Sequence, residues 1–398
     1  MIKHMNRRIL IPLIMILFNY WGCSANSDEI PRLGLKIDPS YKIRLSEFAD
    51  DIEYISLESN IPITYINNLA YDEAYIVSTV KKPLARYDLQ GKLLNTYGAI
   101  GHGPQEYLYA RTFAVNKSLQ QVVIECQNRM LFFEITGKYL YSVDIKCRDN
   151  VRDIYFVGDN RIALFFDNTS GRAKYNWLVV DLMGNIIEEK HNSVMFSNPK
   201  NIAWSEAIIT YKINDQVCYY EQFNDTVFAL NCNNRVGKFV IDKQDHKFTP
   251  EWYMNYTNQA FTKGRVSNMN NYIFWPISFV ETSDYFFVHY HGLDYKHNVA
   301  MCSKSDDSIV LNPKGKTGGL INDIDGGLSF IPKKCFSIKG DEYLIGWYYP
   351  YELKAHVASD AFKNSNPQYP EKKKALEKLA NSLSENDNPV LMLVKLKE

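Results

Sequence analysis

The clearest pattern in the chain is a hydrophobic run followed by a polar turn, and it returns six times. Its copies are residues 84–92, 131–138, 177–185, 227–233, 299–303 and 390–395. In the first three copies the turn contains Gly91, Gly137 and Gly184, which are 46 and 47 residues apart. Self-similarity at this period is typical of the blades of a β-propeller, in which each repeat forms a small sheet. The spacing therefore predicts a propeller.

The segments between these copies predict the remaining strands. In the second repeat, runs at 113–115, 122–125, 130–135 and 140–143 predict four short strands separated by turn residues. Further upstream, residues 51–58 alternate polar and apolar side chains, which predicts a strand with one buried face. That strand has no partners before it, and the last repeat ends without an outer strand. Pairing the two would close the ring and remove exposed strand edges.

We therefore predict an all-β chain, a six-bladed β-propeller over residues 46–398 with a short C-terminal helical insertion at about 354–386. Within the insertion, residues 371–383 place Leu376, Leu379 and Leu383 on one helical face. Residues 243–271 interrupt the period, and we interpret them as a connection between blades. Because the repeated residues are those that pack, we expect specificity in this connection, in the loop at Asp323 and in the insertion.

The first residues predict export. Lys3, Arg7 and Arg8 precede an apolar run of ten residues, 9–18, which is too short for a comfortable membrane span. Gly22-Cys23 after such a run resembles the lipobox of bacterial lipoproteins. The resemblance implies a signal peptide over 1–22, a lipid-modified Cys23 and a tether and lead-in over 23–45. It also implies an exported outer-membrane lipoprotein, facing the periplasm or the cell surface, that meets the membrane through its N-terminal lipid. The alternative is an ordinary secretory signal with an incidental cysteine.

Four segments resemble a known family. Residues 101–107 have the pattern Gly-x-Gly-Pro-x-Glu-Tyr, which resembles the connection between blades of NHL-type propellers. Residues 219–228, 322–332 and 388–392 resemble the six-bladed β-propeller lipoproteins of Gram-negative gut anaerobes, a family of unknown function. The resemblance extends from Asp51 to the C-terminus. It implies the fold and supplies no catalytic residues.

Composition and cysteine spacing narrow the function classes. Lys and Arg number 45, as do Asp and Glu, so the formal net charge is zero and a nucleic-acid partner is not expected. Beyond Cys23, no cysteine pair has the C-x-x-C spacing of zinc ribbons or thioredoxins. Buried free thiols are the favoured interpretation, although an exported protein can form disulfides. These remaining cysteines are Cys126, Cys147, Cys218, Cys232, Cys302 and Cys335.

Three pairs of residues are candidates for binding. His289 and His291 share one face of a strand and could begin a metal site with Asp284 or His297, although packed or hydrogen-bonded histidines are more typical. Asp323 and Asp325 precede Gly326 as in a calcium loop, but Lys334 stands where the last acidic ligand belongs, so a capped turn is favoured. His102 and Glu106 could perform acid–base chemistry or build the loop around Pro104. We expect neither a metal ion nor a cofactor.

No catalytic motif is present in the sequence. We therefore predict a monomeric binding or scaffold module whose partner is a glycan, a peptide or an outer-membrane protein. The alternative is a hydrolase or lyase that works in the central funnel. Three or more ionisable groups converging in the funnel would favour the enzyme, whereas an aromatic, largely uncharged rim would favour binding.

Overall fold

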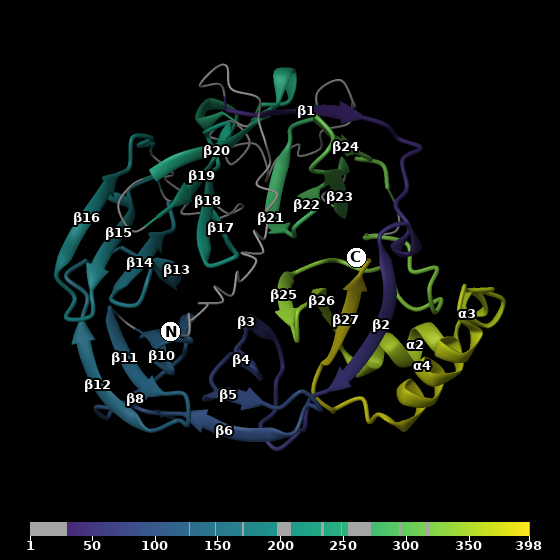
Figure 1. The fold of residues 1–398 in the computed structure, drawn as a ribbon, viewed down its shortest axis with the longest axis horizontal. Helices are drawn as coiled ribbons and strands as arrows, with labels where there is room; N and C mark the ends of the chain where they lie inside the picture. The colour runs from purple at the N-terminus through teal and green to yellow at the C-terminus, as the bar shows by residue number, and fades with distance from the viewer. Residues whose placement is uncertain are drawn as a thin grey trace, which may run out of the picture.

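The computed structural model describes residues 30–126, 128–147, 149–168, 171–196, 208–231, 235–247, 249–253, 272–293, 296–315 and 318–397. The predicted signal peptide at 1–22, Cys23, Cys232 and most of the 243–271 connection lie outside these residues. The described strands form sheets arranged around a central axis, with one strand of each sheet near the axis and the last at the periphery (Figure 1). The predicted β-propeller is confirmed.

In the part of the chain that the structure describes, five of these sheets contain antiparallel meanders of four strands and a sixth contains three. We number the sheets as blades in chain order, beginning with β3. Blade 1 is β3 (Ile66–Tyr71), β4 (Tyr75–Thr79), β5 (Leu84–Tyr87) and β6 (Leu93–Tyr97); blade 2 is β9 (Thr112–Asn116), β10 (Gln121–Cys126), β11 (Arg129–Glu134) and β12 (Tyr139–Asp144); blade 3 is β13 (Val151–Phe156), β14 (Arg161–Phe166), β15 (Tyr175–Asp181) and β16 (Ile186–His191). Blade 4 is β17 (Ile208–Ile213), β18 (Gln216–Glu221), β19 (Thr226–Leu230) and β20 (Arg235–Asp242); blade 5 is β21 (Trp275–Glu281), β22 (Tyr285–His291) and β23 (His297–Ser303); blade 6 is β25 (Lys334–Ile338), β26 (Asp341–Tyr348), β27 (Val390–Leu396) and β2 (Ala49–Ser56).

The repeated hydrophobic run is the third strand of every blade. Its six copies coincide with β5, β11, β15, β19, β23 and β27. In five of the six blades the third strand has a hydrogen-bonded strand on each side, and its two faces pack against the adjacent blades, as alternate residues of β11 do. This position explains why the run is apolar throughout rather than alternating; in β27, for example, five consecutive residues from Val390 are buried.

The turn glycines join each blade to the one before it. Gly91, Gly137 and Gly184 have φ of +81°, +95° and +79°. A Cβ on Gly137 would lie 2.5 Å from the carbonyl oxygen of Thr96, at the end of the outer strand of blade 1. Likewise, a Cβ on Gly91 would clash with the Ser56 carbonyl of blade 6, and a Cβ on Gly184 would clash with the Val143 side chain of blade 2. The glycine repeat therefore reflects both the turn and the contact between blades.

The ring closes through strand β2. It pairs antiparallel with β27 over seven residue pairs, from Ala49 opposite Leu396 to Ser56 opposite Val390, as the sequence predicted. The buried side chain of Asn388 supports this closure. Its amide nitrogen donates to the carbonyls of Glu58 and Ile61, both at 2.8 Å, and its oxygen accepts from the Ile63 amide at 2.7 Å.

Four strands outside the six blades were not predicted. Strand β1 (Arg32–Ile37) pairs in parallel with β20 and with β24 (Ser308–Leu311), so it connects the periphery of blade 4 to the last strand after blade 5 (Figure 1). Strand β1 lies in the segment interpreted as tether and lead-in. The short strands β7 (Ala99–Ile100) and β8 (Glu106–Tyr107) form a parallel pair between blades 1 and 2, and two 3-10 helices occupy Leu45–Glu47 and Gln244–His246.

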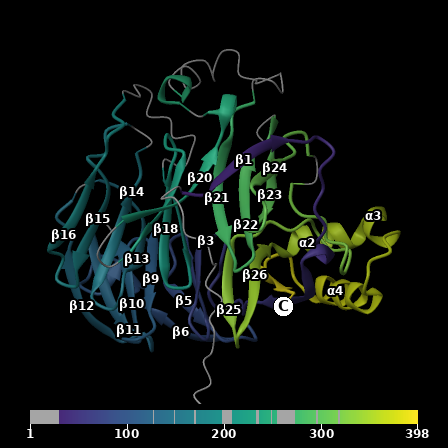
Figure 2. The same ribbon diagram turned by 45° about the horizontal axis from the view of Figure 1, so that its top comes forward.

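The predicted helical insertion joins β26 to β27. It contains α2 (Pro350–Ala358), α3 (Asp360–Lys363) and α4 (Pro370–Ser382), and it lies outside the ring beside blade 6 (Figures 1 and 2). Proline at the first position of α2 and α4 suits a helix start, because the first amides have no partner within the helix. Leu376, on the face predicted for α4, is buried against Leu353 and Phe362 of the other helices. Lys372 forms an ion pair with Asp51 and so attaches the insertion to β2.

We expect Gly137→Ala to destabilise the fold more than Gly340→Ala. Both glycines have positive φ, but a Cβ on Gly340 would meet nothing within 4 Å. Gly340→Ala should lower the free energy of unfolding by about 1 kcal/mol through backbone strain alone. Gly137→Ala should cost about 3 kcal/mol, because the outer strand of blade 1 must also move. Urea denaturation of both variants measures the difference, and equal losses would show that the contact between blades contributes nothing.

Candidate functional site

Strand order defines two faces of the ring. The front face is the one at which the inner strand of each blade begins and the second strand ends. In blade 5, for example, Trp275 at the start of β21 pairs with His291 at the end of β22 on this face. The opposite face, where the first and second strands of each blade are joined by a turn, is the back face. Inner strands of different blades approach the axis most closely (Figure 1). Side chains at the front ends of these strands can therefore meet although they are distant in sequence.

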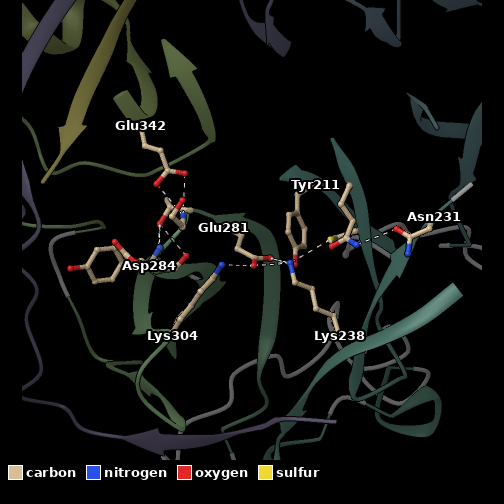
Figure 3. Close-up of polar contacts among 12 residues, drawn as sticks. Tyr211, Asn231, Lys238, Glu281, Asp284, Lys304 and Glu342 are labelled. Carbon is tan, nitrogen blue, oxygen red and sulfur yellow. Dashed lines mark hydrogen bonds and ion pairs between the residues drawn. The ribbon is translucent and has the colours of Figure 1, made fainter. Parts of the chain in front are cut away.

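Three histidines gather at the front end of blade 5. His289 and His291 lie on the face of β22 that packs toward blade 6, in line with buried Phe287. His297 begins β23, and its Nδ1 lies 2.9 Å from Nε2 of His289. The rings of His291 and His297 are 5.0 Å apart. The structure thus brings the two predicted histidines together with His297, whereas Asp284 lies at the back end of β22 (Figure 3).

A lysine from blade 6 faces these histidines. Lys333 precedes β25, and its ammonium lies 4.1 Å from the ring centroid of Trp347, a cation–π contact. Burial lowers the pKa of Lys333 to about 8, with Glu352 opposing the shift. Burial also lowers the pKa of His289 to about 3, and the charges of His297 and Lys333 add to the effect. His289 is therefore neutral at physiological pH, and Lys333 supplies the positive charge of the group. We call His289, His291, His297, Lys333 and Trp347 the blade 5–6 cluster.

The blade 5–6 cluster does not have the geometry of a metal centre. Among the described residues, no group of three or more His, Cys, Asp or Glu side chains is placed to hold a metal ion. The close nitrogen–nitrogen contact between His289 and His297 is a hydrogen bond between two imidazoles, one donating and one accepting. A shared metal would require both of these nitrogens to point at the ion instead.

A second group of ionisable residues lies at the front ends of two inner strands. Arg152 and Asp153 open the inner strand of blade 3, with Nε and Oδ2 at 3.5 Å and a β-bulge at Arg152. Bulges commonly re-aim side chains beside functional sites. The Asp153 carboxylate also accepts from Thr210 Oγ1 at 2.8 Å. Burial lowers the pKa of Lys334, on the inner strand of blade 6, and the charge of Asp153 opposes that shift, so the two groups interact across the axis.

Exposed tyrosines surround part of the same face. Tyr65 precedes β3, Tyr109 lies between β8 and β9, and Tyr351 follows β26; their side chains are 56%, 44% and 56% exposed. They belong to blades 1, 2 and 6, which are consecutive around the ring. The Tyr351 ring stacks on that of Tyr349 at 5.8 Å with an interplanar angle of 12°. We call Tyr65, Tyr109 and Tyr351 the tyrosine rim.

The back face carries a polar network that joins blades (Figure 3). Glu281, at the end of β21, has a side chain only 2% exposed and accepts from Lys238 at 2.6 Å, Lys304 at 2.9 Å and the Tyr211 hydroxyl at 2.8 Å. Burial would raise the pKa of Glu281, but the two lysines outweigh burial and lower it. Each charge in this network has a partner, as buried ions require. We assign the network a structural role, since it connects blade 4 to blade 5.

The aspartates at 323 and 325 bind groups of the protein itself. Asp323 accepts from the hydroxyl of Ser46 at 2.6 Å and from its amide at 3.1 Å. Asp325 accepts instead from the Asn322 side chain at 2.6 Å and the Gly327 amide at 2.8 Å. The two carboxylates hold different groups and do not converge on one point. Asp325 thus caps a turn, as favoured from the sequence, whereas Asp323 attaches its loop to the 3-10 helix at Leu45–Glu47.

The loop at 101–107 is also built by its own residues. The Glu106 carboxylate accepts from the Gly103 amide at 2.8 Å, and its backbone carbonyl accepts from Arg129 at 2.8 Å. A Cβ on Gly103 would lie 3.1 Å from that carboxylate, so glycine suits the position. His102 is exposed. No hydrogen bond links His102 to Glu106 in the described structure, so the proposed acid–base pair is not formed.

The sequence did not single out Lys333, Trp347, Arg152 or Asp153. A signal was nevertheless present, because Lys333-Lys334 and Arg152-Asp153 each introduce charge where an inner strand begins. Both criteria for function are met in part. Ionisable groups meet at the front ends of inner strands, and exposed aromatic side chains line part of the front face. No described helix is long and apolar enough to cross a membrane.

The comparisons with known proteins identify the fold and the family. Over nearly its whole length the chain is similar to a Bacteroides fragilis protein inferred to be exported, with a TM-score of 0.66, 14% identity, and coverage of 92% of this chain and 99% of that one. It is also similar to the WD40 repeats of RRP9 (TM-score 0.44, 12% identity, 90% and 99% covered) and to a Bacteroides caccae protein of unknown function (TM-score 0.38, 12% identity, 69% and 83% covered). No curated protein sequence matches the chain. Residues 32–395 match the family described as a domain of unknown function (DUF4934), and the chain belongs to that family.

Proposed function

We propose that this protein is an exported binding module that holds a glycan on the front face of its propeller. The observation that carries the proposal is the tyrosine rim, which exposes three aromatic rings on consecutive blades. A tyrosine ring offers a flat apolar surface with a polar tip, which suits the alternating apolar and hydroxylated faces of a sugar. The closed ring supports the proposal because it holds these rings in place before a ligand arrives, which reduces the entropic cost of binding.

We expect the double variant Tyr65→Ala/Tyr351→Ala to lose glycan binding. Each ring should contribute about 0.5–1.5 kcal/mol, so binding should weaken about tenfold to a hundredfold. A glycan array finds the ligand, and calorimetry with that ligand measures the loss. Leu119→Ala is the control, because Leu119 is also an exposed apolar residue (42%) but lies on a back-face turn.

An array without any bound glycan would overturn the glycan assignment. Unchanged binding by the double variant would place the ligand elsewhere. If the rim instead captured a peptide or a folded protein, with the same dependence on Tyr65 and Tyr351, the binding module would stand and the class of ligand would change.

We further propose that the protein is an outer-membrane lipoprotein anchored through Cys23. The Gly22-Cys23 junction and the inferred export of the similar Bacteroides fragilis protein support this location. Metabolic labelling with palmitate should label the wild-type protein, and Cys23→Ala should abolish the label and release the protein from the membrane fraction. Cys302→Ala, which removes a buried thiol, should leave labelling intact. Equal labelling of the wild type and Cys23→Ala would contradict the anchor.

The ionisable groups at the front ends of the inner strands support a second candidate, a glycan hydrolase or lyase. Arg152, Asp153 and Lys334 converge from opposite sides of the ring, and Asp153 could serve as the acid or base. An enzyme should release new chain ends from the glycan that it binds, and Asp153→Asn should slow release about a hundredfold or more while retaining binding. Wild-type protein that binds its glycan without producing new ends would leave only the binding module.

A further inference from the structure

We propose that the blade 5–6 cluster is a carboxylate-binding subsite, and that the bound glycan therefore contains a sugar acid such as a uronic acid. This inference rests on the proposed glycan-binding function and specifies its ligand. It concerns residues outside the tyrosine rim, on the same face of the ring.

The first support is a lysine without an acceptor. Within the described residues, the Lys333 ammonium forms no ion pair or hydrogen bond, and its contact is the face of Trp347. Glu352 is near enough to influence the charge of Lys333, but its carboxylate accepts from the Tyr349 amide at 2.8 Å. Five other lysines that are buried or partly buried are paired with carboxylates. These pairs are Lys190–Glu221, Lys238–Glu281, Lys243–Asp225, Lys304–Glu281 and Lys372–Asp51.

A half-buried cation without a direct ion pair or hydrogen bond is costly, and a bound anion would lower that cost. The lowered pKa of Lys333 agrees with a site that disfavours the charge when empty. Lys333 nevertheless keeps some exposure, so a ligand can reach it from the front face. A cation would be repelled at the same position.

The second support is the hydrogen-bonding character of the histidine pair. His297 Nδ1 and His289 Nε2 are occupied by their mutual contact, so His297 Nε2 and His289 Nδ1 face outward from the pair. Whichever ring donates, two neutral imidazoles retain one N–H donor and one acceptor on these outer nitrogens. The donor can serve a carboxylate oxygen, and the acceptor can serve a sugar hydroxyl. A carboxylated sugar uses both groups, whereas a simple anion uses only the donor.

The third support is continuity with the tyrosine rim. Glu352, whose charge reaches Lys333, directly follows Tyr351 in the chain. An extended glycan with its carboxylate at Lys333 could therefore place a neighbouring sugar against the exposed Tyr351 ring. One glycan could thus stack a sugar on the tyrosine rim and place its carboxylate in the blade 5–6 cluster.

The test follows the histidine rings by NMR while ligand is added to the purified protein. Sodium glucuronate should shift the signals of His289 and His297 saturably, with a dissociation constant in the millimolar range. Methyl glucoside, the neutral counterpart, should shift them little. Lys333→Gln should weaken glucuronate binding about tenfold or more, since hydrogen bonds to charged groups contribute about 1.5–3 kcal/mol.

Lys354→Gln is the matched control. It removes a lysine of α2, the helix that also carries Tyr351 and Glu352. The Lys354 ammonium donates to the Leu383 carbonyl at 3.0 Å, so glucuronate binding should remain unchanged. His297→Asn is the second variant; because His297 is exposed, the substitution should be tolerated, and it should weaken binding severalfold.

The absence of saturable shifts with glucuronate, or equal affinity in Lys333→Gln and wild type, would overturn the subsite. Acetate or inorganic phosphate binding as tightly as glucuronate would overturn the assignment to a sugar acid. If neutral glycans still bind through Tyr65 and Tyr351 in that case, the proposed function stands without this inference. If no glycan binds at all, both proposals fall.

Discussion

The pairing of β2 with β27 is the interaction on which the ring depends. Every other blade is a meander of residues close in sequence, but blade 6 combines seven residues from the start of the propeller with strands from its end. Asn388 reinforces the pairing through backbone groups more than 320 positions away in the chain. Blades contact one another mainly through side chains, so a ring left open would expose strand edges at blade 6 and lose the support of its neighbour. Closure therefore converts a row of small sheets into one rigid body.

The repeat could be predicted from the sequence because it reflects burial within each blade. Third strands are covered on both faces, and their turn glycines meet the preceding blade, so both leave a local pattern at a fixed period. Strands β1 and β24 left no such pattern. Their pairing is parallel and joins residues 32–37 to partners near positions 240 and 310, and parallel pairing across such a separation has no local signature. The helix at 370–382 was predictable because its apolar face follows helical spacing.

Only part of the candidate site could be predicted from the sequence. His289 and His291 stood out because two residues apart on a strand means one shared face. Their contact with His297 follows from strand pairing within blade 5. Lys333 and Trp347 could not be assigned to them, because these residues come from another blade, and the packing between blades is set by the complete ring. The network around Glu281 could not be predicted either, because its two lysine partners belong to β20 and to the turn after β23.

The blades pack in a regular way, but their charged groups are not arranged regularly. We therefore expect ligand specificity where charged groups lack partners. On the blade 4 side of the front face, Glu221 is already engaged by Lys190 and by Asn176 at 2.9 Å, so its charge is neutralised within the protein. On the blade 6 side, Lys333 rests on an indole ring and faces neutral histidines. The helical insertion, which is absent from the repeat, adds Tyr351 and Glu352 at this same place. Among the described residues, a ligand that supplies an anion and a sugar surface therefore meets a lysine without an ion pair and an exposed tyrosine in the same sector of the front face.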